Sequence, residues 1–244
     1  MIVTVKGLII KETKFGEGDK IITILTPDFG IIQAVAKGAR SYKSKFLAGS
    51  QLFCYTNFGL TKRGKMFSLS FAEPIHTFYE IRKSVEKISL SVYFCELLSE
   101  VCTDSHQADA ALRLALNTLF KLSKNDNLAQ IKASFELRLI SDAGFTPELS
   151  CCVKCGRTGH FNLFSANDGG VQCCDCCGSG NALSAGTIRA ISHIITCELK
   201  KVFAYEADEN VLFELEHTAE NYILCQIGRL PQSLKYYQKL KINR

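Results

Sequence analysis

Two patterns of apolar residues divide the chain. In the first 75 or so residues, short runs rich in Val, Ile, Phe and Thr alternate with turn sequences such as Phe15-Gly16-Glu17-Gly18-Asp19, which is typical of β-strands. Strands are expected at residues 2–11, 20–26, 30–36, 51–60 and 65–73. Five short strands at this spacing favour a small closed barrel, of which the OB-fold is the common example. The pattern alone fits an SH3-like barrel equally.

From Ile81 onward the apolar residues recur at helical spacing. A dense apolar helix is expected between Val85 and Val101, and two more over 110–122 and 128–143. Gly144 and Pro147 end the third of these. Ser184 can cap another helix that runs to about Leu199. A last helical stretch covers about 208–230, and the short basic end Lys235–Arg244 follows it.

A segment rich in cysteine and glycine, residues 148–181, interrupts the helical region. The predicted fold class is therefore α+β: an N-terminal five-stranded barrel, then an α-helical domain with the cysteine-rich segment inserted as a separate module. The expected domains are residues 1–80 for the barrel, 81–147 with 182–244 for the helical domain, and 148–181 for the cysteine-rich module.

The twelve cysteines are unevenly distributed. Seven of them crowd into residues 151–177, and the other five are scattered through apolar segments, where a free cysteine packs as a small hydrophobe. The N-terminus has no basic start, long apolar run or cleavage site of an export signal. A chain of 244 residues can also build a core without disulfides. Clustered thiols in a reducing compartment point to a metal.

The spacing C-x2-C-x17-C-x2-C is formed by Cys152, Cys155, Cys173 and Cys176. It lies within the range of zinc sites, in which each CxxC turn aims two thiolates at one ion. Four protein ligands leave no open position for water, so one structural Zn²⁺ is expected. Cys151, Cys174 and Cys177 leave a shifted ligand register open. His160 is a weaker substitute, because it is far from either pair.

All of the excess positive charge is in the first third of the chain. Residues 1–80 hold eleven Lys or Arg against six Asp or Glu, and the whole chain has a net charge of +5. No acidic residue occurs between Asp28 and Glu73. Such a surface attracts a polyanion, because neutralising phosphates releases counterions. The candidate DNA-binding residues are Lys37, Arg40, Lys43, Lys45, Lys62, Arg63 and Lys65.

Three aromatic residues in or near the basic segments, Tyr42, Phe46 and Tyr55, could supply stacking faces for unpaired bases. The competing interpretation, favoured for each one taken singly, is that it packs in the core. Basic loops can likewise serve only to keep a domain soluble. A run of seven bases without an acid favours nucleic-acid contact instead.

The sequence contains no recognisable catalytic constellation. Walker-type, His-Glu-x-x-His, Gly-x-Ser-x-Gly and zinc-deaminase patterns are missing, and the five histidines are dispersed. No apolar run approaches the roughly 18–20 residues of a membrane helix. We therefore expect a protein that is not an enzyme and that lies in the cytoplasm, associated with the nucleoid.

Several motifs in order along nearly the whole chain resemble those of bacterial RecO proteins. At the N-terminus they are Lys6-Gly7-Leu8-Ile9-Ile10, Phe15-Gly16-Glu17-Gly18-Asp19-Lys20 and Val35-Ala36-Lys37-Gly38-Ala39-Arg40. In the centre they are Gly144-Phe145-Thr146-Pro147, Cys152-x-x-Cys155-Gly156 and Gly169-Gly170-x-x-Cys173-x-x-Cys176. The combination is far more specific than any single motif.

The resemblance implies an OB-fold, a helical domain and an inserted zinc module. It also implies recombinational repair of the RecF type. There the protein would bind single- and double-stranded DNA, anneal complementary strands and work with RecR to load RecA onto DNA covered by single-strand binding protein. The resemblance selects Lys37 and Arg40 as DNA contacts and Cys152, Cys155, Cys173 and Cys176 as zinc ligands. Cys151, Cys174 and Cys177 depart from its pattern.

Two other functions compete with strand mediation. A protein–protein adaptor of the same pathway would bind RecR tightly but DNA only weakly. A sequence-specific transcription factor would need a helix with a strongly basic face for the major groove, and no segment follows that pattern.

Overall fold

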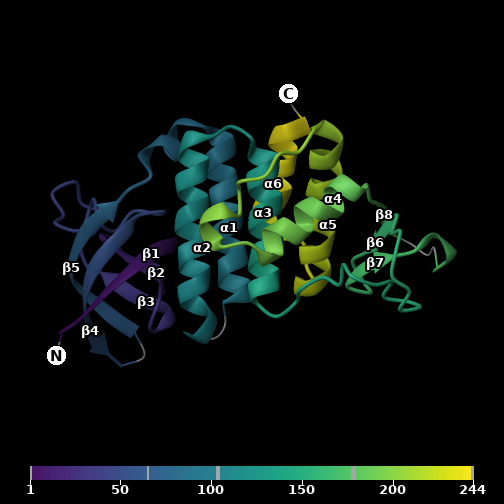
Figure 1. The fold of residues 1–244 in the computed structure, drawn as a ribbon. Coiled ribbons are helices and arrows are strands. Elements are labelled where there is room, and N and C mark those ends of the chain that lie inside the picture. The colour runs from purple at the N-terminus through teal and green to yellow at the C-terminus, as the bar shows by residue number, and fades with distance from the viewer. Residues whose placement is uncertain (1, 65, 103–104, 177–179, 243–244) are drawn as a thin grey trace. The chain divides into compact units, whose positions relative to one another are not determined.

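The computed structural model describes residues 2–64, 66–102, 105–176 and 180–242 (Figure 1). Contacts divide the chain into two compact units, residues 1–124 with 231–244, and residues 125–230. These units are defined by compactness, and their boundaries differ from those of the three functional domains predicted from the sequence. The three functional domains remain a prediction.

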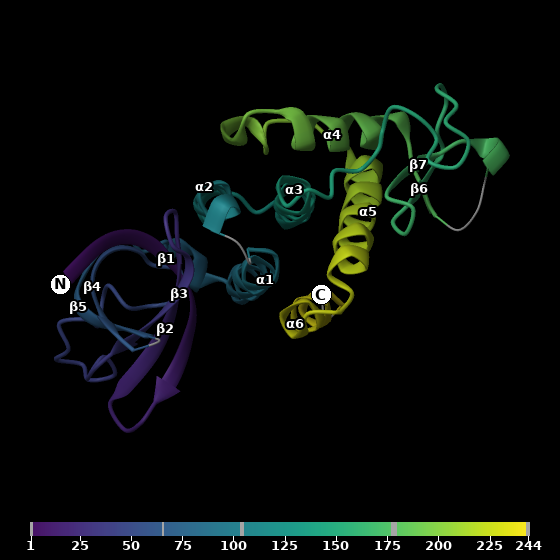
Figure 2. The same cartoon turned by 90° about the horizontal axis from the view of Figure 1, so that it is seen from below.

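Five strands in the first unit form a closed barrel: β1 (Ile2–Phe15), β2 (Asp19–Thr26), β3 (Gly30–Ala36), β4 (Tyr55–Arg63) and β5 (Met66–His76). Their order around the barrel is β1-β2-β3-β5-β4. β1 pairs antiparallel with both β2 and β4, while β3 runs parallel to β5. This Greek-key closure is that of the OB-fold and decides against the SH3-like alternative. Figure 2 shows the five barrel strands from below.

Side chains that alternate between the two faces of the strands form two apolar layers in the first unit. Ile22, Ile24 and Ala34 point into the barrel and are fully buried. Leu8 and Leu25, which pair across β1 and β2, are also buried but lie outside that cluster. Helices α1 (Val85–Val101) and α2 (Ser105–Lys124) pack against this side of the barrel, and α6 (Gln232–Ile242) packs on α1. A short 3-10 helix, η1 (Tyr79–Lys83), precedes α1.

The first unit differs from the sequence expectation at three places. β4 begins at Tyr55 rather than at residue 51, because residues 37–54 form a chain of turns that places Phe46 and Cys54 in the barrel core. β1 extends to Phe15 and pairs with β2 as a long hairpin. Most of the basic end, expected only to follow the last helical stretch, belongs to the helix α6. Its Leu234 and Tyr237 are buried.

The second unit combines three helices with the cysteine-rich insert. The helices are α3 (Leu128–Asp142), α4 (Ala185–Thr196) and α5 (Glu209–Ile227), and α3 packs on both of the others. The insert contains a small sheet that was not expected, with β7 (Gly170–Gln172), β6 (Leu163–Ser165) and β8 (Asn181–Ala182) in that order. Two 3-10 turns complete the unit, η2 (Cys174–Cys176) and η3 (Leu199–Lys201).

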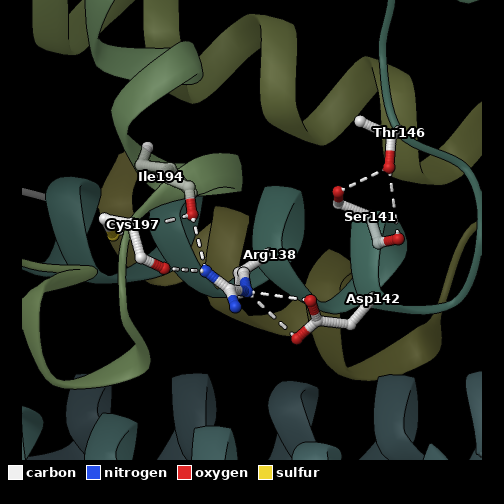
Figure 3. Close-up of polar contacts among 6 residues, drawn as sticks. All are labelled: Arg138, Ser141, Asp142, Thr146, Ile194 and Cys197. Carbon is white, nitrogen blue, oxygen red and sulfur yellow. Dashed lines mark hydrogen bonds and ion pairs between the residues drawn. The ribbon is translucent and has the colours of Figure 1, made fainter.

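The end of α4 is held by an arginine from α3 (Figure 3). Arg138 Nη1 donates to the carbonyl oxygens of Ile194, at 3.2 Å, and of Cys197, at 2.7 Å. Its Nε donates to both carboxylate oxygens of Asp142, at 2.9 and 3.1 Å. Carbonyls at a helix C-terminus lack partners within the helix, so this guanidinium caps α4 and joins it to α3.

A second polar contact between helices of this unit is made by the fully buried side chain of Lys132. Lys132 Nζ lies 2.9 Å from a Glu136 carboxylate oxygen and 2.7 Å from one of Glu220. Burial opposes the charge of Lys132, yet the two carboxylates raise its pKa above the ordinary value. The ammonium group therefore joins α3 to α5 in its charged form.

The insert is attached to α5 through aromatic packing. The Phe164 ring of β6 meets the Tyr222 ring edge-on, with centroids 5.4 Å apart. The Tyr222 hydroxyl donates to the Phe145 carbonyl at 3.1 Å. Over the residues that the structure describes, no helix is both long and apolar enough to span a bilayer.

Candidate nucleic-acid interface and metal centre

The bases predicted to contact DNA lie on the barrel surface. Lys37, Arg40, Lys43 and Lys45 are exposed in the segment between β3 and β4. Lys62 and Arg63 are exposed at the end of β4. Lys65 lies outside the described residues. Phe67 pairs with Ala34, so the β4–β5 turn lies beside β3, the strand that leads into the first segment. The two basic segments therefore flank the same strand.

The first basic segment, residues 37–45, is fixed to the turn between β1 and β2. Gly38 N donates to an Asp19 carboxylate oxygen at 2.7 Å. Arg40 N donates to the Gly18 carbonyl at 3.1 Å, and Arg40 Nη1 to the Glu17 carbonyl at 2.9 Å. Gly38 has a φ of 62°, which an L side chain would resist. The segment is thus an anchored loop, termed the basic loop below.

The three aromatic candidates separate in the structure. Phe46 is 5% exposed and belongs to the barrel core, so its use as a stacking face is wrong. Tyr42 is 80% exposed, with Lys43 Nζ 5.5 Å from its ring centroid. Tyr55 is half-buried in β4. Tyr42 alone stands clear on the basic loop as a base-stacking candidate.

One base of the first third does not belong to the exposed surface. Lys20 is 7% exposed and forms an ion pair with Glu12 at 2.9 Å. It also donates to the Ser50 carbonyl, and Glu12 accepts a bond from the Leu52 backbone. These contacts fasten the far end of the β3–β4 segment to the barrel. The only sequence signal for this role is that Lys20 lies inside an apolar strand.

The four cysteines singled out by their spacing come together. Within the described residues, the Sγ atoms of Cys152, Cys155, Cys173 and Cys176 all lie within 4.8 Å of one another. Gly156 N donates to the Cys152 carbonyl at 2.8 Å, and Gly156 has a φ of 72° that closes the first turn. Cys176 N donates to the Cys173 carbonyl at 3.1 Å and closes the second.

The close approach of the four thiols changes the pKa values of two of them in opposite directions. Cys173 N donates to Cys152 Sγ at 3.4 Å, which lowers the pKa of Cys152 to about 6. Contacts with the Cys155 and Cys173 sulfurs raise the pKa of Cys176 to about 12. A cation favours the thiolate form of its ligands, so ion binding would displace the remaining protons. Four sulfur donors at this separation can hold one metal ion.

The other candidate ligands lie outside this group. Cys151 is half-buried, and Cys174 is exposed with its Sγ 3.6 Å from an Asp175 oxygen. His160 is exposed. Cys177 falls outside the described residues. The ligand set itself stays a prediction, which the geometry of the four thiols favours.

Two ion pairs, which the sequence analysis did not predict, join the region of the first CxxC pair to that of the second. Arg157, after the first CxxC pair, contacts Asp175, inside the second. Lys154 Nζ lies 2.6 Å from Asp168, which also accepts bonds from Ser165 and Gln172. The sequence signal for these ion pairs is a basic residue in or beside one CxxC pair and an acidic residue near the other.

Comparisons with known proteins agree with this architecture. Residues 1–78 match the family described as recombination protein O N terminal, and residues 82–235 match recombination protein O C terminal. DNA repair protein RecO of Acetivibrio thermocellus is 36% identical over 239 residues, which cover 96% of this chain and 95% of that protein. That of Alkaliphilus metalliredigens is 29% identical, covering 94% and 96%. The chain therefore belongs to the RecO family of DNA repair and recombination proteins.

Proposed function

We propose that this protein binds single- and double-stranded DNA through the basic loop and the β4–β5 turn, and anneals complementary strands. The observation that carries the proposal is the anchored loop itself. Lys37, Arg40, Lys43 and Lys45 are exposed, no acidic residue interrupts the segment, and Tyr42 stands out between the bases. Phosphates would bind the lysines and arginines, and an unpaired base would stack on Tyr42.

Annealing follows from the same charges. Two DNA strands repel one another, and a surface that neutralises both backbones lowers the cost of bringing their bases together. No bond is made or broken, so no nucleotide is consumed and no catalytic group is needed. From the family, we propose in addition that the protein works with RecR to load RecA onto DNA covered by single-strand binding protein.

We further propose that Cys152, Cys155, Cys173 and Cys176 hold one structural Zn²⁺. The donor set fits this ion, because four thiolates complete its tetrahedron and leave no position for substrate. The two turns lie in a segment whose described residues form three short strands, and a bound ion would hold the turns together. Arg157 and Lys154 would partly offset the negative charge of a four-thiolate site.

The DNA proposal is tested by fluorescence anisotropy of a labelled single strand over a series of salt concentrations. In the double variant Lys37→Gln with Lys43→Gln, the log–log salt slope should fall by roughly 0.7 for each phosphate that is no longer neutralised. The matched control is Lys200→Gln with Lys201→Gln, two neighbouring exposed lysines of the second unit. Equal slopes for the wild type and the basic-loop variant would contradict the assignment.

The annealing proposal is tested with complementary oligonucleotides covered by single-strand binding protein, without nucleotide. The wild type should accelerate duplex formation, and the basic-loop double variant should do so less. The adaptor alternative predicts strong binding to RecR, no acceleration and negligible DNA affinity at physiological salt.

A further inference from the structure

The last helix of the chain, α6, lies in a stretch of sequence that has basic but no acidic residues. It belongs to the same unit as the barrel. Residues 221–244 contain five Lys or Arg and no Asp or Glu. Helix α6 begins at Gln232, and Ser233 N donates to a Glu96 carboxylate oxygen of α1 at 3.2 Å. The Ser233 hydroxyl donates to the same carboxylate. This contact fixes the start of α6 on α1.

Packing then decides which side chains of α6 face outward. Leu234 and Tyr237 are buried, at 0% and 1% exposure, on the side that packs against α1. Lys235, Tyr236 and Lys239 fall on the opposite side, and all three are exposed, Tyr236 to 55%. Lys239 is four residues from Lys235 and three from Tyr236, so it neighbours both on the helix surface, and the three side chains form a single face.

The two positive charges of this face do not stabilise α6. In the part of the chain that the structure describes, neither Lys235 nor Lys239 lies within ion-pair distance of a carboxylate. Like charges four residues apart destabilise a helix. Lys235 is also in the first turn, where a cation opposes the helix dipole. The wild-type sequence keeps both charges despite these costs.

We propose that the outward face of α6, formed by Lys235, Tyr236 and Lys239, is a second binding site for single-stranded nucleic acid, distinct from the basic loop. The two lysines would contact successive phosphates, and the exposed Tyr236 ring between them would stack on a base. The inference rests on the proposed DNA-binding function and deepens it. With two sites on one unit, each of two complementary strands has its own contact before they pair.

An acidic protein segment is the other polyanion that two lysines would attract. Tyr236 favours nucleic acid, because a stacking platform between cations is what an unpaired base requires and an acidic segment does not. The barrel of the same unit also carries its own exposed bases and Tyr42. Two surfaces of the same chemistry on one unit suit one kind of ligand.

The test measures how many short strands the full-length chain binds. Fluorescent oligonucleotides of about 10 nucleotides, within the span of one site, are titrated at fixed salt. The wild type should bind two. Lys235→Gln with Lys239→Gln should bind one, and so should the basic-loop variant Lys37→Gln with Lys43→Gln. Lys200→Gln with Lys201→Gln should still bind two.

Two further variants separate charge and stacking. Lys235→Arg with Lys239→Arg should restore the second strand, because the charges return on the same exposed positions. Tyr236→Ala should weaken the second strand severalfold without changing the salt slope. All of these positions are exposed, and thermal melting of each variant verifies that α6 still packs through Leu234 and Tyr237.

The outcomes distinguish the two proposals. If the wild type and the α6 variant bind the same number of strands with equal salt slopes, the α6 site is wrong and the basic loop stands. If the α6 variant loses affinity for poly-glutamate while its DNA binding is unchanged, the face serves an acidic protein segment instead. If the wild type binds no DNA, the proposed function fails, and the α6 site with it.

Discussion

The guanidinium of Arg40 donates a hydrogen bond to the backbone carbonyl of Glu17, at a distance of 2.9 Å. The bond joins the basic loop to the turn between β1 and β2. It occupies Nη1, and the same side chain is exposed to solvent. Arg40 therefore has two tasks: it holds the loop in place and it contributes a charge to the surface that we propose binds DNA.

Replacing Arg40 by Lys should separate these tasks. The charge is kept, but an ammonium group does not reproduce the geometry of a guanidinium. Losing one hydrogen bond costs about 1 kcal/mol, or roughly fivefold in affinity, if the loop must be ordered on binding. Anisotropy should show weaker DNA binding with an unchanged salt slope. Lys43→Arg, at a loop position without such a bond, is the control, and equal affinity of the two variants would rule out the anchoring role.

Removing one of the proposed metal ligands should act differently from removing a neighbouring thiol. Cys155→Ser takes one donor from the group of four, whereas Cys174→Ser alters an exposed cysteine outside it. We expect about one zinc per chain in the wild type and in Cys174→Ser, little in Cys155→Ser, and a lower melting temperature for Cys155→Ser alone. Elemental analysis and thermal melting measure both. The reverse pattern would establish the shifted register.

Breaking the buried contact between α3 and α5 should be costly. Lys132→Met leaves the fully buried Glu136 without its cation, which costs about 3–5 kcal/mol. Urea denaturation should record this loss. Adding Glu136→Leu should restore part of it, because Glu220 is 22% exposed and can reach water. Arg113→Ala removes an exposed pair with Asp109 and should change stability by roughly 0–1 kcal/mol.

The cap on α4 predicts a smaller effect. Arg138→Met removes the bonds to the carbonyls of Ile194 and Cys197 (Figure 3), and hydrogen bonds to a charged group are worth about 1.5–3 kcal/mol. The midpoint of urea unfolding should fall accordingly. Arg189→Met, at an exposed position of α4 itself, is the control and should change stability by about 0.5 kcal/mol or less. Equal midpoints would show that water replaces the arginine.

The parts of the fold that local patterns encode were predictable. The alternating strands indicated the barrel, and the two CxxC turns marked the cysteines that meet, because each turn is closed by residues next to it in the chain. The resemblance to RecO proteins, which the comparisons confirm, was carried by short motifs of the same kind. The order of the barrel strands needed the structure, since pairing of β3 with β5 joins residues more than thirty positions apart.

What could not be predicted depends on distant partners. The sequence shows Lys20 only as one more basic residue, yet its contacts with Glu12 and the Ser50 carbonyl keep it buried. Phe46 resembles a surface aromatic among lysines until the β3–β4 segment folds it into the core. The short basic end forms a helix that contacts Glu96 and packs on α1, more than 130 residues earlier in the chain.

The closure of the barrel limits how this unit can recognise other proteins. Every one of its five strands pairs with a neighbour on both sides over part of its length. The backbone left for a partner strand is therefore confined to stretches such as Lys11–Phe15 of β1, which pair with β2 but lie beyond the pairing with β4. The one short seam lies between β3 and β5, with two residue pairs, Ala34 with Phe67 and Val35 with Ser68. Along the stretches that are paired on both sides, recognition thus depends on side chains and not on backbone pairing.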